Sequence, residues 1–253
     1  MTALGTLYGV GAGPGASDLL TLRAVNVLKS VDVLALPRSS DYGASVAWEI
    51  IAPALGELAE LPPSQTRLRL TFPMSKDPAR VRPHVESAVN AIGAHLVEGR
   101  SVAFVTEGDP SVFSTFGYVR QEAQKRWPEL RVEVVPGVTS ITAVASIGGV
   151  PLADGHERVA IVPATYGVDD LVDLLRRFDT VVLMKLGAEM PIILAALEQT
   201  GLTDRAFFVH KATMAEQRFE PDVRKVRDEH GGCFSMLIVK RRDRSGVLLG
   251  NEP

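Results

Sequence analysis

The stretch SVAFVTEGDPSVFST, residues 101–115, decides the fold expected for this chain. Its apolar run, Val102 to Val105, stops at the acidic, turn-forming cluster Glu107-Gly108-Asp109-Pro110, and a helical pattern follows. This order predicts a buried strand, a tight loop and a helix. In an open α/β sheet, ligands bind at the carboxyl ends of the strands, because strand ends and helix N-termini expose unpaired backbone groups there. The loop is therefore a candidate ligand-binding loop, and the alternative is an ordinary strand-to-helix connection.

A glycine-rich loop near the N-terminus follows another short strand. Thr6 to Gly9 is expected to be that strand, and it leads into GVGAGPG at residues 9–15. Strand, glycine loop and helix in this order are typical of phosphate-binding loops. However, Pro14 lacks the backbone N–H that such a loop uses, and the next strand, Val31 to Leu36, ends in Pro37-Arg38, where a dinucleotide site needs an acidic residue. The glycines therefore indicate close backbone approach rather than a phosphate.

Further elements of the N-terminal half follow from the pattern of apolar residues. Val132 to Val135 predicts a strand that ends in a second candidate loop, Pro136 to Ser140. Arg67 to Phe72 alternates polar and apolar residues, so Arg67 and Arg69 should share one face of a strand. Helices are expected after the candidate caps Ser17 and Asp18, and over residues 42–54, 77–98 and 114–127.

The break Gly148-Gly149-Val150-Pro151 divides the chain into two predicted domains, residues 1–150 and 151–253. The second half also alternates strands and helices. We expect strands at 159–163, 180–186, 206–210 and 233–239, and helices at 168–178, 189–199 and 222–229. The predicted fold class is α/β, with two α/β domains and a ligand cleft between them.

The composition excludes several classes of protein. With 253 residues, a formal net charge of −3 and a pI near 6.0, the chain is not expected to bind nucleic acid. Its single cysteine, Cys233, excludes a disulfide framework and a cysteine-rich metal site. No apolar run reaches the roughly 18 to 20 residues that cross a bilayer, and the N-terminus lacks the pattern of a secretion signal. We therefore expect a soluble cytoplasmic protein with no membrane contact.

Common catalytic motifs are missing from the sequence as well. There is no His-Glu-x-x-His, Cys-x-x-Cys or Gly-x-Ser-x-Gly motif, and the five histidines show no metal-ligand spacing. No metal site is expected. A reaction whose reactivity lies in its substrates is therefore the favoured hypothesis.

Six motifs, in order along the chain, carry a resemblance to one family. They are GTLYGVGAGPGASDLLTLRAV at 5–25, VAFVTEGDPSVFSTF at 102–116, VEVVPGVTSITAVAS at 132–146, GVPLA at 149–153, VVLMKLG at 181–187 and CFSMLIVKR at 233–241. Over nearly its whole length the chain resembles the tetrapyrrole methyltransferases of corrinoid and sirohaem synthesis. Within that family, residues 72–74, 111–116 and 234–239 resemble the branch that methylates precorrin-2 at C20.

The resemblance implies two α/β domains with S-adenosylmethionine bound in the cleft between them, usually in a homodimer. S-adenosylhomocysteine and precorrin-3A, an intermediate of cobalamin biosynthesis, would be the products. Two segments depart from the family pattern: Glu107 replaces a small or apolar residue, and residues 210–213 differ from a Glu-Arg-Ala-Gly type of segment. The residues that match the family's cofactor motifs are Pro14, Glu107, Gly108, Asp109, Val112, Thr139, Ser140, Met184 and Ala212.

Methyl transfer of this kind is an in-line displacement at a sulfonium, so positioning carries most of the catalysis. The electron-rich meso carbon of the implied substrate need only be held about 3 to 3.5 Å from the methyl group. Asp109 or Glu107 is a candidate acceptor of the proton that leaves, although either carboxylate can instead accept hydrogen bonds from the cofactor. Five basic residues are candidates for binding the carboxylates of the substrate: Arg38, Arg67, Arg69, Lys76 and Arg80. The alternative is that these residues form a solvated charged face.

Several alternatives stay open at the level of sequence. The substrate could be cobalt-factor II, the cobalt complex of the cobalt-early pathway. Other relatives of the family methylate a diphthamide precursor on a translation factor or a ribose in ribosomal RNA, and the acidic balance weighs against both. Outside this class are a nucleotide-dependent oxidoreductase built on the glycine loop and a tetrapyrrole carrier without catalysis.

Overall fold

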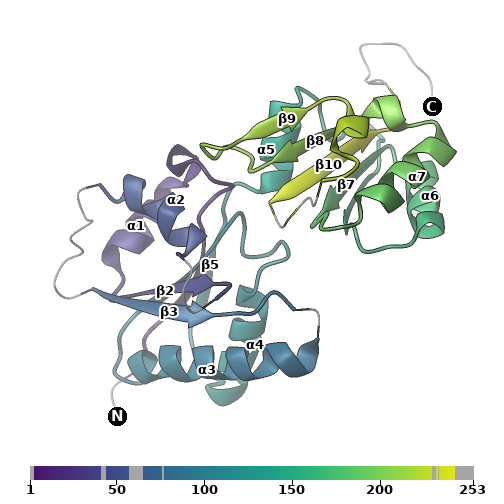
Figure 1. Cartoon of the computed structure of the whole chain (residues 1–253). Helices are drawn as coiled ribbons and strands as arrows, with labels where there is room; N and C mark the ends of the chain where they lie inside the picture. Colours follow the sequence, from purple (N-terminus) through teal and green to yellow (C-terminus); the bar gives the residue numbers. More distant parts are fainter. Residues whose placement is uncertain are drawn as a thin grey trace. The chain divides into compact units, whose positions relative to one another are not determined.

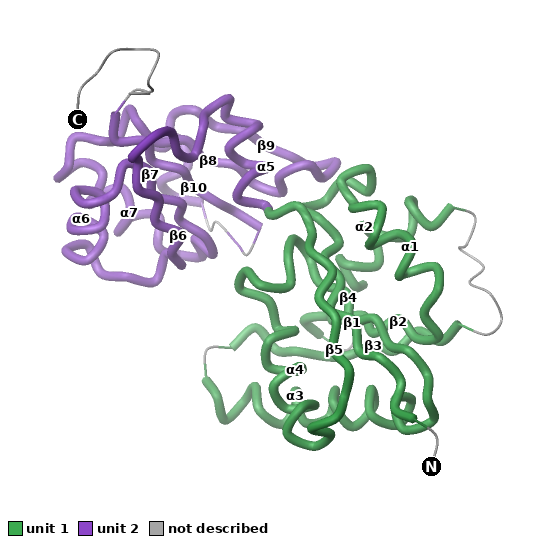
Figure 2. Tube along the Cα trace, turned by 180° about the vertical axis from the view of Figure 1, so that it is seen from behind, with its two compact units in different colours: residues 1–139 green, residues 140–253 purple. Residues whose placement is uncertain are grey.

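The computed structural model describes residues 3–40, 44–56, 65–75, 77–229, 232 and 234–242. The chain divides into two compact units, Met1–Thr139 and Ser140–Pro253 (Figure 2). The second unit thus begins with helix α5 (Ser140–Ile147), before the boundary predicted after residue 150. The division falls earlier because α5 packs against a strand of the second unit, and because Gly148 abuts Phe207, where a Cβ would lie 2.3 Å from Cζ of the ring.

The first unit contains a five-stranded sheet with the order β3-β2-β4-β1-β5, in which every pair is parallel. Its strands are β1 (Leu7–Gly11), β2 (Val33–Arg38), β3 (Thr66–Thr71), β4 (Val102–Thr106) and β5 (Val132–Val135). Every residue of β4 is buried, as expected for a central parallel strand with helices on both faces. The prediction of a buried strand before the Glu107 loop is confirmed.

Helices cover both faces of this sheet (Figure 1). One face carries α1 (Leu22–Ser30) and α2 (Val46–Ala54), and the other carries α3 (Pro78–Leu96) and α4 (Phe116–Arg126). Phe104 of β4 and Phe116, the first residue of α4, both belong to the buried core of this unit, and their ring centroids lie 5.8 Å apart.

Two predicted helix starts in the first unit need comment. The cap of α1 is Thr21, whose Oγ1 accepts a hydrogen bond from the Ala24 N–H at 3.1 Å, rather than Ser17 or Asp18. Residues Ser17–Leu19 form only a 3-10 turn, η1, which lacks a side-chain cap. The predicted helix over 42–54 begins at Val46, and residues 42 and 43 lie outside the described residues.

The second unit contains a mixed five-stranded sheet with the order β6-β7-β10-β8-β9. Its strands are β6 (Val159–Pro163), β7 (Thr180–Met184), β8 (Ala206–His210), β9 (Arg218–Glu220) and β10 (Ser235–Lys240). Strands β6 and β7 are parallel, whereas β10 runs antiparallel to both β7 and β8. The short edge strand β9 was not predicted, because three residues give no measurable alternation. The α/β class is confirmed for both units.

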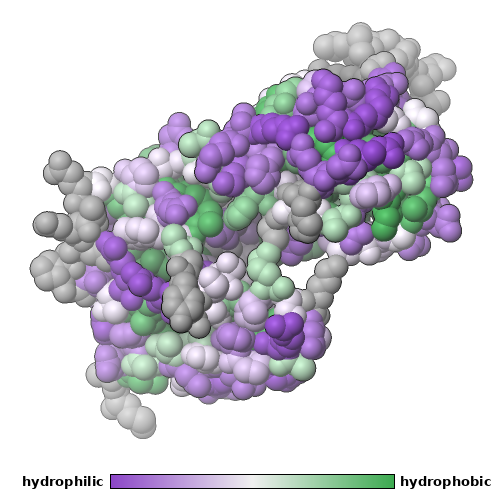
Figure 3. All heavy atoms as spheres, in the orientation of Figure 1, coloured by the Kyte–Doolittle hydropathy of each residue, from purple (hydrophilic) through white to green (hydrophobic). Residues whose placement is uncertain are grey.

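Helices again lie on both faces of the second sheet. Figure 1 shows α6 (Val168–Arg177) and α7 (Met190–Thr200) on one side and α5 on the other. The helix predicted over 222–229 is only a 3-10 turn, η3 (Val223–Val226), because its two buried valines give too short an apolar stripe for a longer helix. Hydrophilic side chains gather over β8, β9 and η3 (Figure 3), where Arg224 pairs with Asp204 at 2.6 Å.

Within the described ranges, every helix falls short of the length and apolar character that crossing a bilayer requires.

A buried ion pair fastens the segment before β6 to the end of β10. Lys240 Nζ lies 2.6 Å from Glu157 Oε2, and the two side chains are 11% and 1% exposed. The same oxygen accepts the Asp154 N–H at 3.0 Å, while Oε1 of Glu157 is buried and has no hydrogen-bond partner among the described residues. Removal of Lys240 would therefore leave a buried carboxylate with little compensation.

Lys240→Met should lower the free energy of unfolding of the second unit by about 3 to 5 kcal/mol. The double variant Glu157→Leu/Lys240→Met should recover much of this loss, because it buries no charge. Hydrogen exchange of the β10 amides measures the effect. The fluorescence of Trp48 and Trp127, the only two tryptophans and both in the first unit, is the internal control. Unchanged β10 protection in the single variant would contradict the assigned role of the pair.

Candidate functional site

Three glycine loops meet at the carboxyl ends of β1, β4 and β5. Gly13 and Gly108 exchange backbone hydrogen bonds, with N···O distances of 3.2 Å from the Gly13 N–H and 2.7 Å from the Gly108 N–H. The N–H of Ala12 also donates to the Thr106 carbonyl at 2.8 Å. The glycine loop and the Glu107 loop, predicted separately from the sequence, are therefore parts of one structure, which we call the glycine junction: Gly11, Gly13, Gly108 and Gly137.

The glycine junction leaves no room for side chains. A Cβ on Gly137 would lie 2.2 Å from the Gly108 carbonyl oxygen, and a Cβ on Gly11 would lie 2.7 Å from the Cα of Gly137. Gly108 also has a φ of +65°, which favours glycine. Any residue other than glycine at Gly11 or Gly137 would push the loops apart, so the junction depends on the absence of Cβ atoms.

Asp109 ties two of these loops together. Its buried carboxylate accepts hydrogen bonds from the Gly137 N–H at 2.9 Å and from the Ser111 N–H at 2.8 Å, and also from the Ser111 hydroxyl. Burial would raise the pKa of Asp109, but the hydrogen bonds from Ser111 and Gly137 outweigh it and lower this pKa below its usual 3.8. Both carboxylate oxygens thus accept hydrogen bonds from the protein, and the ionised form is favoured, so Asp109 is better suited to holding the loops than to accepting a proton.

Glu107 lies in a different environment on the same loop. It follows the last residue of β4 and is partly buried. Burial raises the pKa of Glu107 above its usual 4.5, and hydrogen bonds from its own N–H and from the Ala47 N–H offset only part of that shift. Ala47 belongs to the first turn of α2, which Ser45 caps through a 3.4 Å hydrogen bond from the Trp48 N–H. The contact with α2 was not visible in the sequence, because the two segments lie about sixty residues apart in the chain.

Four further candidates, Pro14, Val112, Thr139 and Ser140, lie close to these loops in the sequence. Pro14 is buried directly after Gly13, and Val112 is partly buried, with its N–H donating to the Asp109 carbonyl at 3.2 Å. Thr139 is the last residue of the first unit, and Ser140 begins α5 at the start of the second.

The candidates in the second unit lie at one end of its sheet. Met184 ends β7 and is paired with Met236 of β10, and Ala212, 7% exposed, follows the end of β8. Because β10 is antiparallel to both, its first residue, Ser235, lies at the same end, where its hydroxyl is 2.8 Å from His210 Nδ1. Sequence reasoning missed this His210–Ser235 contact, which joins two strands.

Backbone strain concentrates at this end of the sheet as well. Lys185, Lys211 and Thr213 all have positive φ, at +58°, +49° and +64°. Such conformations cluster at functional sites.

The predicted substrate-binding arginines lie mostly on two neighbouring strands. Arg67 and Arg69 are exposed on the same face of β3, as the alternation predicted, and the Arg67 guanidinium stacks 3.7 Å from the ring centroid of Trp48. Partial desolvation of the Arg67 guanidinium, and then the charge of Arg69, lower the pKa of Arg67 although the residue is exposed as a whole. Arg38, at the end of β2, donates from Nε to Thr71 Oγ1 at 3.2 Å. Arg80 is exposed in the first turn of α3, and Lys76 lies outside the described residues.

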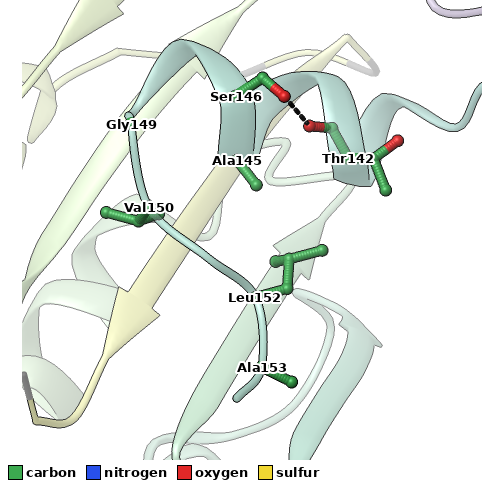
Figure 4. Close-up of a pocket in the computed structure, with 7 residues that line it drawn as sticks. All are labelled: Thr142, Ala145, Ser146, Gly149, Val150, Leu152 and Ala153. Carbon is green, nitrogen blue, oxygen red and sulfur yellow. Dashed lines mark hydrogen bonds between the residues drawn. The ribbon is translucent and has the colours of Figure 1, made fainter. Parts of the chain in front are cut away.

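A separate cavity of about 360 Å³ lies in the second unit, between α5 and the segment 149–153 (Figure 4). Among the described residues, its lining includes Ala145, Val150 and Leu152 and no charged side chain. The Ser146 hydroxyl at its wall donates to the Thr142 carbonyl at 3.0 Å. Small and apolar residues make up most of this lining, and the described residues there offer no acid, base or nucleophile other than hydroxyls.

No group of three or more His, Cys, Asp or Glu side chains among the described residues is arranged to hold a metal ion.

Comparison with known proteins identifies the class of protein that this fold and site define. The family model of the tetrapyrrole (corrin/porphyrin) methylases matches residues 6–225. The chain belongs to this family, and the resemblance stated from the motifs is confirmed.

Particular relatives narrow the branch of the family. The chain is 34% identical over 240 residues to the cobalt-precorrin-2 C(20)-methyltransferase of Salmonella typhimurium, covering 94% of this chain and 97% of that one. It is 32% identical over 243 residues to the precorrin-2 C(20)-methyltransferase of a Sinorhizobium species, covering 93% and 95%. Among solved structures, it is similar to the uroporphyrin-III C-methyl transferase of Thermus thermophilus complexed with S-adenyl homocysteine. That match has 25% identity and a TM-score of 0.65, and covers 94% of this chain and 98% of the other.

Gly137→Ala should lower the free energy of unfolding of the first unit by about 1 to 3 kcal/mol, because its methyl group overlaps the Gly108 carbonyl. Binding of S-adenosylhomocysteine, measured by calorimetry, should be lost with it. Urea unfolding followed by tryptophan fluorescence reports on this unit directly.

Gly117→Ala is the matched control for this substitution. Gly117 lies in α4, and a Cβ there would have no atom within 4 Å, so the added methyl should raise stability by up to about 1 kcal/mol. Equal stability of the two variants would contradict the steric account of the junction.

Proposed function

We propose that this protein transfers a methyl group from S-adenosylmethionine to C20 of precorrin-2, in cobalamin biosynthesis. The observation that carries the proposal is the similarity to C20-methyltransferases over more than nine-tenths of both chains. The glycine junction supports it, because it provides a rigid backbone surface at the carboxyl ends of β1, β4 and β5, and its four glycines carry no cationic side chain to repel a sulfonium.

The residues present fit the proposed cofactor. The missing Cβ atoms at Gly11 and Gly137 permit close approach of the three loops, so that the surface proposed to face the cofactor is backbone rather than side chain. Bound S-adenosylmethionine supplies an electrophilic methyl group. The residues proposed to hold it are Pro14, Glu107, Gly108, Asp109, Val112, Thr139, Ser140, Met184 and Ala212.

Positioning is the main contribution proposed for the protein. The electron pair of the C20 position forms the new carbon–carbon bond while the sulfur–methyl bond breaks, so no nucleophilic side chain is required. The proton on C20 must then leave. Of the two candidate acceptors, Glu107 is the better, because its raised pKa makes its carboxylate a stronger base than that of Asp109, whose oxygens already accept hydrogen bonds from the protein.

Arginines are proposed to bind the carboxylates around the rim of the substrate. Arg38, Arg67 and Arg69 lie on adjacent strands, and Trp48 holds the Arg67 guanidinium in place. Arg80, and Lys76 outside the described residues, complete the proposed set. A guanidinium suits this task because its planar donors match a carboxylate.

A second candidate substrate is the cobalt complex of the same ring, cobalt-factor II. A cobalt-containing substrate is favoured by the relative from Salmonella typhimurium, whose name specifies cobalt-precorrin-2. The metal would belong to the substrate. We further propose that the protein is cytoplasmic and forms a homodimer. Light scattering after size-exclusion chromatography measures its molar mass and so tests the dimer.

The proposed function predicts methyl transfer in an anaerobic incubation of the protein with S-adenosylmethionine and either precorrin-2 or cobalt-factor II. Mass spectrometry should show one added methyl group, and NMR with a labelled methyl carbon should place it at C20. The faster substrate decides between the two candidates. If neither compound is methylated while S-adenosylhomocysteine still binds, the proposed substrate is wrong and the family assignment stands.

Glu107→Gln should lower kcat/KM by about 10²- to 10⁴-fold, because it removes the proposed proton acceptor. In the wild type, kcat/KM should rise with pH through the raised pKa of Glu107, above 4.5, and this rise should be absent from the variant. Since the folded pKa is raised, ionisation destabilises the fold as pH increases past it, so the variant should be at least as stable as the wild type at neutral pH. Wild-type rates in the variant would refute the role.

The double variant Arg67→Ala/Arg69→Ala should raise the KM for the tetrapyrrole by about tenfold, because it removes charge-assisted hydrogen bonds to the substrate. The dissociation constant of S-adenosylhomocysteine should not change. Arg120→Ala, on the exposed side of α4, is the control for general loss of positive charge. Equal losses of substrate and S-adenosylhomocysteine affinity would show that the arginines do not act on the substrate.

A further inference from the structure

The loop between β4 and α4 holds a phenylalanine in an unfavourable backbone conformation. Phe113 has a φ of +49°, and its residue is 46% exposed. Four non-glycine residues in the described part of the chain have positive φ, and Phe113 alone among them carries an aromatic ring. Glycine adopts this conformation without strain, whereas a bulky residue there is an outlier. The chain thus carries a large apolar side chain at a position whose backbone conformation favours glycine.

The loop is fastened on both sides of Phe113. Before it, the Val112 N–H donates to the Asp109 carbonyl at 3.2 Å, and Asp109 is itself bound to Gly137. After it, the Ser114 hydroxyl donates to Thr106 Oγ1 at 3.0 Å and accepts the Phe116 N–H at 3.1 Å. These contacts join the loop to β4, to the glycine junction and to the start of α4. The surroundings therefore impose the conformation of Phe113, as is typical of strained residues at ligand sites.

The chemistry of the exposed ring indicates the kind of ligand. A phenyl ring offers a flat apolar face and no hydrogen-bond donor or acceptor, so it discriminates in favour of a large, flat, conjugated partner. It follows Glu107 by six residues on the same strand-to-helix loop, where the proposed proton acceptor lies. Of the two ligands in the proposed reaction, the tetrapyrrole has the larger conjugated apolar surface.

We propose that Phe113 is a substrate-positioning residue whose ring packs against the tetrapyrrole macrocycle and fixes its orientation over the Glu107 loop. The proposal rests on the proposed function for the identity of the ligand. In this proposal, Phe113 on the strained loop orients the ring system, and the arginines of β2 and β3 bind the carboxylates at its rim.

The test compares Phe113→Gly, Phe113→Leu and Phe113→Tyr with the wild type. Phe113→Gly removes the ring and the backbone strain together, so its melting temperature should change little. Its kcat/KM for the tetrapyrrole should fall about tenfold while the dissociation constant of S-adenosylhomocysteine is unchanged. Phe113→Leu keeps apolar bulk without a flat ring and should show a similar loss, whereas Phe113→Tyr should behave like the wild type. Tyr118→Ala, which removes an exposed aromatic residue from α4, should leave kcat/KM unchanged.

A direct binding measurement separates this inference from the proposed function. Precorrin-2 is titrated anaerobically into protein saturated with S-adenosylhomocysteine, so that no methyl can be transferred, and its dissociation constant is compared between wild type and variants. About tenfold weaker binding by Phe113→Gly and Phe113→Leu supports the contact, even if the wild type proves to methylate another substrate. Unchanged tetrapyrrole affinity, or an equal loss of S-adenosylhomocysteine affinity, overturns it.

Discussion

The reciprocal hydrogen bonds between Gly13 and Gly108 set the distance between the loops that follow β1 and β4, and the candidate site depends on that distance. Gly137 presses against the same point from the loop after β5, so closely that a Cβ there would overlap the Gly108 carbonyl. Only because these residues lack side chains can the Asp109 carboxylate reach the Gly137 N–H. Three loops from three strands therefore form one rigid surface, which suits a reaction whose catalysis comes mainly from positioning.

Two carboxyl groups on this surface, separated in the chain by Gly108, have opposite properties because of their surroundings. The Asp109 carboxylate accepts three hydrogen bonds from Ser111 and Gly137, and its pKa is lowered. Glu107 is held against the first turn of α2 with less compensation for its burial, and its pKa is raised. The same loop thus carries one carboxylate suited to holding the loops together and another suited to accepting a proton. This difference in environment, rather than residue type, distinguishes their proposed roles.

In the second unit, candidate residues are gathered at one end of a mixed sheet rather than a parallel one. Its central strand β10 is antiparallel to β7 and β8, so that the first residue of β10 joins the carboxyl ends of the other two. Met184, Ala212, His210 and Ser235 are thereby gathered at one end, where three residues with positive φ also lie. At the opposite end of β10, the buried pair of Lys240 and Glu157 fastens the segment before β6. The candidate site residues and the ion pair therefore lie at opposite ends of β10.

The sequence by itself determined the class of fold, the central strand at 102–106 and the shared face of Arg67 and Arg69, because these depend on local apolar periodicity. It also determined the family, since the motifs extend over nearly the whole chain. It could not give the cap of α1, the edge strand β9 or the 3-10 turn η3, where a few residues and their packing decide the outcome. Only the tertiary structure decided that Gly13, Gly108 and Gly137 meet, that Ala47 binds Glu107 and that Trp48 stacks on Arg67. These contacts join residues far apart in the chain, and no local pattern records which of them will be neighbours.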